Sequence, residues 1–282
     1  MDVKLGRRLY RWIEEGSEWA LERLQDSAYP GRGGNVPPVL LVTLPKAGSI
    51  FIHTALRRTL RLPMLKIACP GIHEQTLDHR RLAKFVKGNA VCREHFAARD
   101  FMLEGLRLAG IRKMVVHVRD PRAAVLSWTR NMERVLEDDG EAALVLDNEQ
   151  TTPAAYFDGS FAQRLEWQVA HQLPRYVEWI EGWMDAIERN SGAGITFKVT
   201  TYEDFAADNR TFVEELLRFY EITVDPSWIS IPRYEIGKAN VFHVSQTTTR
   251  EEMGEALYAR ASAMVPDRLI TRFGWPRRDA AA

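Results

Sequence analysis

Short runs of aliphatic residues alternate along this chain with longer segments of helical periodicity. The aliphatic runs have the length and β-branched content of buried strands, and they lie at 39–44, 89–95, 114–118 and 195–200. Helical segments are expected between and after them, at 49–60, 78–87, 100–108 and 160–190. A last one follows the run 201–205 and extends through residue 220. Strands that alternate with helices in this way predict a parallel sheet. We therefore expect an α/β fold of three layers around a central, mainly parallel sheet.

The first 38 residues have a different pattern. Between residues 5 and 24, apolar side chains recur at helical spacing with Arg and Glu between them: Leu5, Leu9, Trp12, Ile13, Gly16, Trp19 and Ala20. This pattern predicts an amphipathic helix, which could dock on the rest of the chain, form a homodimer or lie on a membrane surface. Its mixed charges favour docking on the rest of the chain. Residues 29–38 are rich in Gly and Pro and read as a linker, so we expect one main domain from 39 to 282.

Two of the expected strands end in a turn that contains proline and then pass into a helix. The first such segment is residues 39–51, and the second is residues 114–128. In the first, the backbone N–H groups after Pro45 begin a helix and have no partners within it. Gly48 lets a ligand approach the backbone closely, while Lys46 and Ser49 add a positive charge and a hydroxyl. The segment therefore predicts a phosphate-binding loop.

The loop does not have the Walker A pattern, because Lys46 precedes the glycine. It resembles instead the phosphosulfate-binding loop of sulfotransferases that use 3′-phosphoadenosine-5′-phosphosulfate (PAPS), in which a strand is followed by Pro-Lys/Arg-x-Gly-Ser/Thr and a helix. The resemblance implies a P-loop-like sulfotransferase fold. It also implies that one stretch of the loop binds the 5′ end of PAPS and of its product, 3′,5′-bisphosphoadenosine (PAP). This stretch consists of Lys46, Ala47, Gly48, Ser49, Ile50 and Phe51.

The second segment resembles the site at which the same family binds the 3′-phosphate of PAPS. In the family, an Arg closes a strand and a Ser follows eight residues later inside the next helix. Arg119 and Ser127 have this spacing. A helix that starts near Pro121 brings Ser127 back to one face after about two turns, so both side chains can reach one phosphate.

Further matches add a general base and an adenine contact. In the family a basic residue, any residue and then His close a strand, and the His is the catalytic base; Arg93 and His95 occupy these positions. Arg93 would then balance charge on the sulfuryl oxygens. Tyr202 corresponds to a family Tyr that contacts the adenine end of PAPS. From the residues alone, His95 could also be a structural side chain, and the other candidates for the base are His73, His117 and His243.

The C-terminal part both supports the resemblance and departs from it. The ending Phe273-Gly274-Trp275 resembles that of many bacterial sulfotransferases. The family's Arg-Lys-Gly loop, which clamps the 3′-phosphate, does not occur in this chain. Possible substitutes lie between residues 233 and 250, and the sequence does not choose among them: Arg233, Gly237, Lys238, His243 and Arg250. The missing clamp would also fit a non-catalytic relative that binds PAPS or PAP.

Composition excludes several other classes of function. The 38 basic and 38 acidic residues give zero net charge, so no overall field attracts nucleic acid or anionic membranes. The 7 His and 2 Cys are too sparse to predict a metal cluster, and Cys69 and Cys92 do not form a Cys-x-x-Cys pair. No apolar run approaches the length of a membrane span. We expect a cytoplasmic enzyme with reduced cysteines.

Together these features predict an enzyme that transfers a sulfuryl group from PAPS to a hydroxyl, or less readily an amine, without a metal. Lys46 would neutralise the leaving 5′-phosphate, and His95 would take the acceptor proton. The acceptor could be a small molecule, a carbohydrate or a lipid, and aromatic side chains of 160–190 could line its pocket. Residues 137–159 read as a solvated loop or a lid. An atypical P-loop kinase is the remaining alternative from another class.

Overall fold

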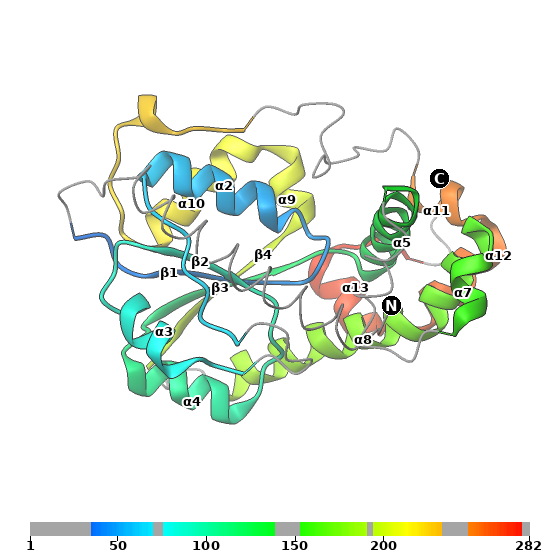
Figure 1. Ribbon diagram of the computed structural model, residues 1–282, viewed down its shortest axis with the longest axis horizontal. Coiled ribbons are helices and arrows are strands. Elements are labelled where there is room, and N and C mark those ends of the chain that lie inside the picture. Colours follow the sequence, from blue (N-terminus) through cyan, green and yellow to red (C-terminus); the bar gives the residue numbers. More distant parts are fainter. Residues whose placement is uncertain (1–34, 70–75, 139–152, 191–193, 233–247, 278–282) are drawn as a thin grey trace, which may run out of the picture. The chain divides into compact units, whose positions relative to one another are not determined.

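The computed structural model describes residues 35–69, 76–138, 153–190, 194–232 and 248–277 (Figure 1). Within them, four strands form one sheet in the order β2-β1-β3-β4. The strands are β1 (Val39–Thr43), β2 (Val91–Glu94), β3 (Lys113–Val118) and β4 (Thr196–Thr201). β1 pairs in parallel with both β2 and β3, with Val42 opposite Glu94 on one side and opposite Val116 on the other. The expected parallel sheet is confirmed.

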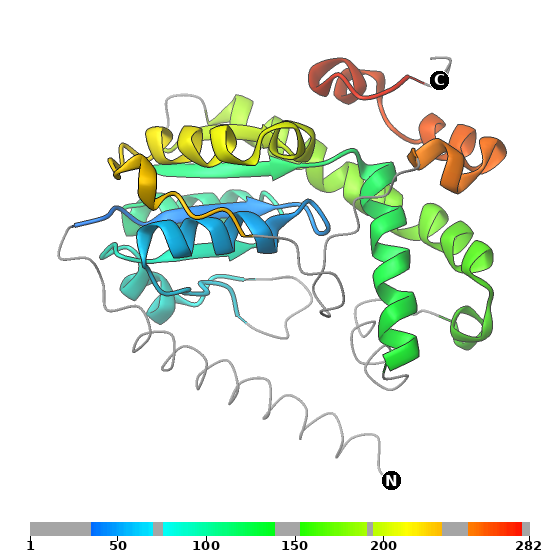
Figure 2. The same ribbon diagram turned by 90° about the horizontal axis from the view of Figure 1, so that it is seen from above.

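The chain forms two compact units, which we describe separately. The first unit contains the four strands, apart from the last residue of β3, together with described residues of 48–117 and 183–232. Its complete helices are α2 (Ser49–Leu60), α3 (His79–Phe85), α4 (Asp100–Ala109), α9 (Tyr202–Ala207), α10 (Asn209–Phe219) and the 3-10 turn Pro226–Trp228. Figures 1 and 2 show α2 and α10 on one face of the sheet and α3 and α4 on the other. This arrangement gives the three layers expected from the sequence.

The second unit is helical and includes the short segment 44–47, which follows β1. Its helices are α5 (Pro121–Asp138), α7 (Ala154–Asp158), residues 161–182 of α8 (Phe161–Arg189), α11 (Thr249–Met253), α12 (Glu255–Ala263) and α13 (Asp267–Phe273). α5 contacts both α11 and α12. The remaining residues of α8, 183–189, belong to the first unit.

The core of the first unit lies on both faces of β1. Every residue of this strand is buried, which explains why it is a continuous apolar run rather than an alternating one. From the α10 side, the Tyr220 hydroxyl donates a hydrogen bond to the backbone carbonyl of Leu40. Burial raises the pKa of the Tyr220 hydroxyl, so this group stays protonated and keeps its role as a donor. This hydrogen bond fixes β1, the strand that directly precedes the predicted phosphate-binding loop.

Differences from the sequence-based boundaries have local causes. The helical stretch that ends at residue 220 is divided at Asp208, whose side chain accepts hydrogen bonds from the backbone of Arg210 and Thr211 and so starts α10. The helix expected at 160–190 is present as α8, a single helix of 29 residues that contains Pro174. The predicted loop at 137–159 overlaps the end of α5 and all of α7, and residues 139–152 lie outside the described residues. The predicted N-terminal helix and most of the linker lie outside them as well.

Candidate active site

The loop after β1 has an unusual backbone at two positions. Lys46 has φ 65° and Gly48 has φ 76°, both in the left-handed region. At Gly48 a Cβ atom would in addition lie 3.2 Å from the ring of Tyr202, which is tighter than most Cβ contacts. Gly48 is the N-cap of α2, and none of the described side chains caps this end or places a carboxylate in the first turn. The backbone N–H groups at the N-terminus of α2 are therefore not capped by a described side chain, and a helix end of this kind can bind an anion.

Ser49 and Arg93 meet beside this helix end. The Arg93 guanidinium donates a hydrogen bond of 3.0 Å to the Ser49 hydroxyl, which joins α2 to β2. Its Nε is buried and has no hydrogen-bond partner among the described residues. Burial lowers the pKa of Arg93, because the charged form loses contact with water. An anionic oxygen at this point would satisfy a charge that is otherwise costly to bury.

The ring of His95 is held by Thr43 at the end of β1. Nδ1 of His95 lies 2.7 Å from the backbone carbonyl of Thr43 and 3.1 Å from its hydroxyl. A carbonyl oxygen can only accept a hydrogen bond, so the proton of the neutral imidazole belongs on Nδ1. The lone pair is then on Nε2, the nitrogen that can accept a proton. This tautomer is the one a general base requires.

Glu94, between Arg93 and His95, has a different role. Side chains alternate along a strand, so Glu94 faces away from its two neighbours. Its carboxylate is buried and accepts hydrogen bonds of 2.7 and 3.1 Å from the backbone N–H groups of Ile67 and Ala68, and Lys66 lies 3.7 Å away. Glu94 therefore anchors the chain after α2 and is not a candidate for the chemistry.

In the second unit, Lys46 has one partner in the other motif and a second partner three residues beyond the end of that motif. Its Nζ donates a hydrogen bond of 3.0 Å to the side-chain oxygen of Asn131 in α5. Its backbone carbonyl accepts one of 2.8 Å from the Arg119 guanidinium. The two motifs found in the sequence are thus directly bonded to each other. Asn131 was not predicted; the available signal was its position four residues after Ser127, which places both on one face of α5.

The buried guanidinium of Arg122 stabilises the start of α5. The Asp120 carboxylate accepts hydrogen bonds from the backbone and the guanidinium of Arg122. The same guanidinium donates to the Ser262 hydroxyl on α12 and to the Pro276 carbonyl, and it lies over the Tyr258 ring at 5.0 Å. Ser262 on α12 and Pro276 are thereby bonded to α5, the helix that carries the predicted phosphate ligand Ser127.

The predicted site residues divide between the two units. Gly48, Ser49, Arg93, His95 and Tyr202 belong to the first, whereas Lys46, Ala47, Arg119 and Ser127 belong to the second. Ile50 is exposed, and the Phe51 ring is buried with its centroid 5.0 Å from that of Phe205. Phe51 is therefore a core side chain of the first unit.

The other candidates from the sequence are engaged elsewhere or not described. His117 is buried and hydrogen-bonded to the Thr200 hydroxyl at 2.8 Å. Arg250 forms an ion pair with Glu255. The remaining candidates for the clamp or the base lie outside the described residues: His73, Arg233, Gly237, Lys238 and His243.

The described part of the chain holds no group of three or more His, Cys, Asp or Glu side chains placed to share a metal ion. Within the same residues, no helix has both the length and the apolar character needed to cross a membrane.

Comparison with known proteins gave matches only among solved structures. No family model matches the chain, and no curated protein sequence does. The mouse sulfotransferase SULT7A1 in complex with PAP aligns at 15% identity over 74% of this chain, with a TM-score of 0.45; this chain covers 65% of the length of the mouse protein. A sulfotransferase from Alicyclobacillus acidocaldarius aligns at 15% identity over 83% of this chain and 96% of its own, with a TM-score of 0.47.

A retinol dehydratase in complex with retinol and PAP aligns at 14% identity over 87% of this chain and 85% of its own, with a TM-score of 0.45. Similarity of this degree does not identify an activity, which has to come from the residues of the site.

Proposed function

We propose that this protein is a sulfotransferase that uses PAPS and transfers the sulfuryl group to a hydroxyl of its acceptor. The observation that carries the proposal is the hydrogen bond from Arg119 to the Lys46 carbonyl. It joins the loop that resembles the 5′-phosphosulfate site to the residue that corresponds to the 3′-phosphate ligand. One nucleotide with phosphates on both its 5′ and 3′ oxygens would use both motifs, and PAPS is such a nucleotide.

The proposed nucleotide contacts follow from the chemistry of the loop. The N-terminus of α2 offers backbone N–H groups to the 5′-phosphosulfate, and Lys46 adds a positive charge three residues earlier in the chain. Lys46 would leave Asn131 for the bridging oxygen on which negative charge grows as the sulfuryl group departs. Arg119 and Ser127 would bind the 3′-phosphate, and Tyr202 would lie against the adenine end.

The proposed reaction uses His95 as the base. The acceptor oxygen attacks sulfur while the bond from sulfur to the 5′-phosphate oxygen breaks, and PAP leaves. The acceptor proton passes to Nε2 of His95, because Nδ1 already carries the proton that bonds to the Thr43 carbonyl. Arg93, which the Ser49 hydroxyl orients, would offset charge on the oxygens of the transferring group.

A non-catalytic relative is the second candidate, and the absent Arg-Lys-Gly sequence favours it. The described residues do not show what replaces the clamp. The Arg122 guanidinium is not a substitute, because it is bonded to Ser262 and Pro276 within the protein. Such a relative would bind PAP and transfer nothing.

The experiment is a transfer assay with ³⁵S-labelled PAPS and a panel of aliphatic alcohols, phenols, sugars and amines. We expect label in at least one hydroxyl acceptor, with formation of PAP in equal amount. The matched control is the Lys46→Ala variant, which should lose transfer while it remains folded. Binding of PAP without transfer to any acceptor would favour the non-catalytic relative, and consumption of ATP with Mg²⁺ would favour a kinase.

A further inference from the structure

His95 is the first residue after the end of β2. The pairing of β2 with β1 runs to Glu94 opposite Val42, and residues 96–99, which follow His95, belong to no strand or helix. The next element, α4, starts at Asp100. The imidazole itself is bonded to the Thr43 carbonyl through Nδ1. Its direction therefore depends on how firmly the chain is held after His95 as well as before it.

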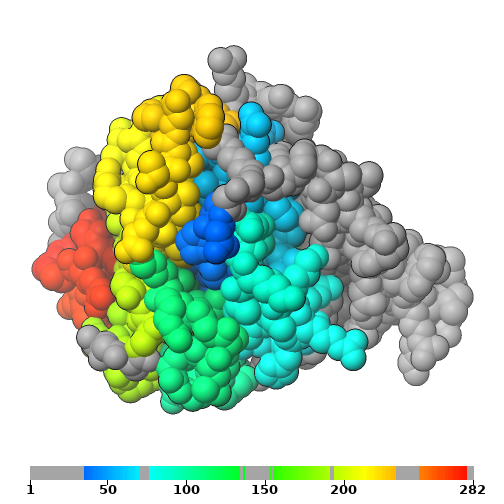
Figure 3. Space-filling view, turned by 90° about the vertical axis from the view of Figure 1, so that its left-hand side faces the viewer, coloured from blue at the N-terminus to red at the C-terminus, as the bar shows by residue number. Residues whose placement is uncertain are grey.

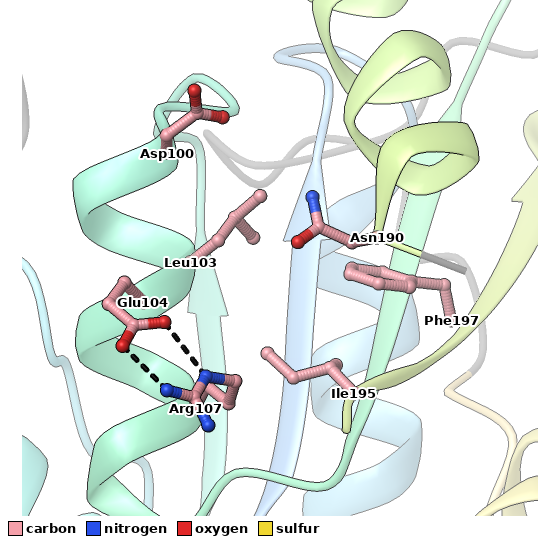
Figure 4. A pocket seen from close by; sticks show the side chains of 7 residues that line it. All are labelled: Asp100, Leu103, Glu104, Arg107, Asn190, Ile195 and Phe197. Carbon is pink, nitrogen blue, oxygen red and sulfur yellow. Dashed lines mark hydrogen bonds and ion pairs between the residues drawn. The ribbon is translucent and has the colours of Figure 1, made fainter. Parts of the chain in front are cut away.

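α4 gives the chain after His95 limited support. Figure 3 shows α4, in green, at the surface of the first unit, and its side chains Phe101 and Leu108 are 59% and 71% exposed. On another side of the helix, a cavity of about 240 Å³ lies between α4, the end of α8 and the start of β4 (Figure 4). The first residue of α4, Asp100, pairs with Arg189 of α8 at 3.3 Å, but both side chains are exposed, and such pairs contribute little to stability.

Trp183 of α8 holds the same segment from the interior of the first unit. Its side chain is fully buried, and its indole Nε1 donates a hydrogen bond of 3.2 Å to the backbone carbonyl of Phe96. The Phe96 ring is buried as well, and its centroid lies 6.0 Å from that of Trp183. Because the indole nitrogen can only donate, this bond sets the direction in which the Phe96 carbonyl points.

The bond lies one peptide unit beyond the proposed base. The backbone of His95 is thus held by β2 on one side and, through Phe96, by Trp183 on the other. A base acts only within hydrogen-bond reach of the proton that it accepts, and a displacement of about 1 Å in an active site can lower a rate about 10²-fold. A fixed backbone on both sides of His95 is therefore of direct value to the reaction.

We propose that Trp183 is a positioning residue for His95. By holding the Phe96 carbonyl, it keeps the imidazole against Thr43, with Nδ1 protonated and Nε2 free for the acceptor proton. Trp183 acts through the backbone and takes no part in the proton transfer itself. The inference deepens the proposed transfer reaction and rests on it for the role of His95 as the base.

The exchange Trp183→Phe removes the N–H donor and keeps an aromatic ring. With an aliphatic alcohol and saturating PAPS, kcat should fall about 10- to 100-fold, while the affinity for PAP stays close to that of the wild type. In the His95→Ala background the same exchange should lower the rate no further, because no base remains to be positioned. The matched control is Trp228→Phe, at a side chain of the first unit that is 49% exposed, and it should leave kcat unchanged.

A second measurement, ¹⁵N NMR of the imidazole nitrogens, needs no activity. The spectra are recorded at pH 8, where an ordinary imidazole is neutral, and the His95 signals are assigned by their loss in His95→Ala. In the wild type, Nδ1 should have the shift of a protonated nitrogen and Nε2 that of an unprotonated one. In Trp183→Phe the two shifts should move toward each other, as in a mixture of tautomers, whereas Trp228→Phe should leave them unchanged.

The kinetic and spectroscopic results can each overturn the proposal. An equal loss of rate from Trp183→Phe with and without His95 would make Trp183 a purely structural residue, and so would His95 shifts that are the same in Trp183→Phe and the wild type. If the wild type transfers no sulfuryl group to any acceptor, the proposed function fails. The NMR comparison then decides by itself whether Trp183 holds the His95 ring.

Discussion

At Lys46 the backbone and the side chain are both constrained. Its φ of 65° is uncommon for a residue with a Cβ atom, and such strain is maintained only where the surroundings impose it. Here Arg119 binds the carbonyl and Asn131 binds the ammonium group. The backbone of Lys46 is therefore held by Arg119 before a ligand binds, whereas its ammonium group is bound to Asn131 and would move to the leaving oxygen in the proposed reaction.

Lys46→Ala should lower kcat about 10²- to 10³-fold and weaken PAP binding much less. The reason is that the lysine faces charge that grows on the leaving oxygen as the transition state forms. Steady-state kinetics with the acceptor found in the transfer assay, together with calorimetry for PAP, measure the two effects separately. Near-normal turnover would remove Lys46 from the leaving-group site.

His95→Ala should keep PAP binding and lose about 10²- to 10⁴-fold in sulfation of an aliphatic alcohol. Activity of the wild type should fall at acidic pH, because a protonated imidazole cannot accept the acceptor proton. Rates at saturating PAPS between pH 5 and 9 check both statements. A variant within a few-fold of the wild type would make His95 a structural residue.

The individual residues also show which features of the candidate site have a signal in the sequence and which do not. Lys46, Arg93 and His95 are candidates from the sequence because each belongs to a short motif of fixed spacing. Asn131 has only a weak signal, its position four residues after Ser127, because its contact with the site is a hydrogen bond to a residue 85 positions earlier in the chain. The tautomer of His95 likewise depends on the carbonyl of Thr43, which is 52 positions away.

At the scale of elements, α2 carries a buried histidine that the chemistry does not use. His53 is 5% exposed, and its Nε2 has no hydrogen-bond partner in the described part of the chain. Burial, and then the positive charges of Arg93, Arg57 and Lys66, lower the pKa of His53 well below 6.5. In the folded protein His53 is therefore neutral at pH 7 and resists protonation.

This predicts an acid-sensitive step in stability. Between the lowered folded pKa and about 6.5, the unfolded chain binds a proton at His53 that the folded chain does not, so stability falls as pH drops below about 6.5. One such group contributes at most about 1.4 kcal/mol per pH unit. In His53→Gln the loss of stability between pH 7 and 5, measured by urea unfolding, should be smaller than in the wild type. An equal loss in both proteins would exclude His53 as its source.

The start of α5 should be among the most sensitive points of the second unit. Arg122→Leu leaves the buried Asp120 carboxylate without its ion-pair partner and breaks the bonds to Ser262 and Pro276, so we expect a loss of about 3–5 kcal/mol. Arg268→Leu, which removes an exposed pair with Glu181, is the matched control and should cost less than about 1 kcal/mol. Denaturant unfolding measures both, and equal losses would contradict the assigned role of Arg122.

The elements themselves were largely predictable, because continuous apolar runs and helical periodicity report burial directly. The division at Asp208 is a local capping effect that the sequence contained. The network of Arg122 is different: it joins residues up to 154 positions apart, and no local pattern indicates that Ser262 and Pro276 face α5.

At the scale of the whole molecule, zero net charge means that phosphates must be recognised by local groups. In the proposed site, two separate sets of groups bind the two phosphate ends of one nucleotide. A ligand with phosphate on both the 5′ and 3′ oxygens should therefore bind much more tightly than one with the 5′-phosphate alone.

Thermal unfolding with PAP and with AMP is the most direct test of this claim. At a concentration about 100 times its dissociation constant, PAP should stabilise the protein by about 2.7 kcal/mol, and AMP at the same concentration should do so much less. Arg119→Ala should abolish the difference between the two nucleotides. Equal shifts with PAP and AMP in the wild type, or a shift only with ATP and Mg²⁺, would contradict the assignment of a 3′-phosphate site and with it the proposed use of PAPS.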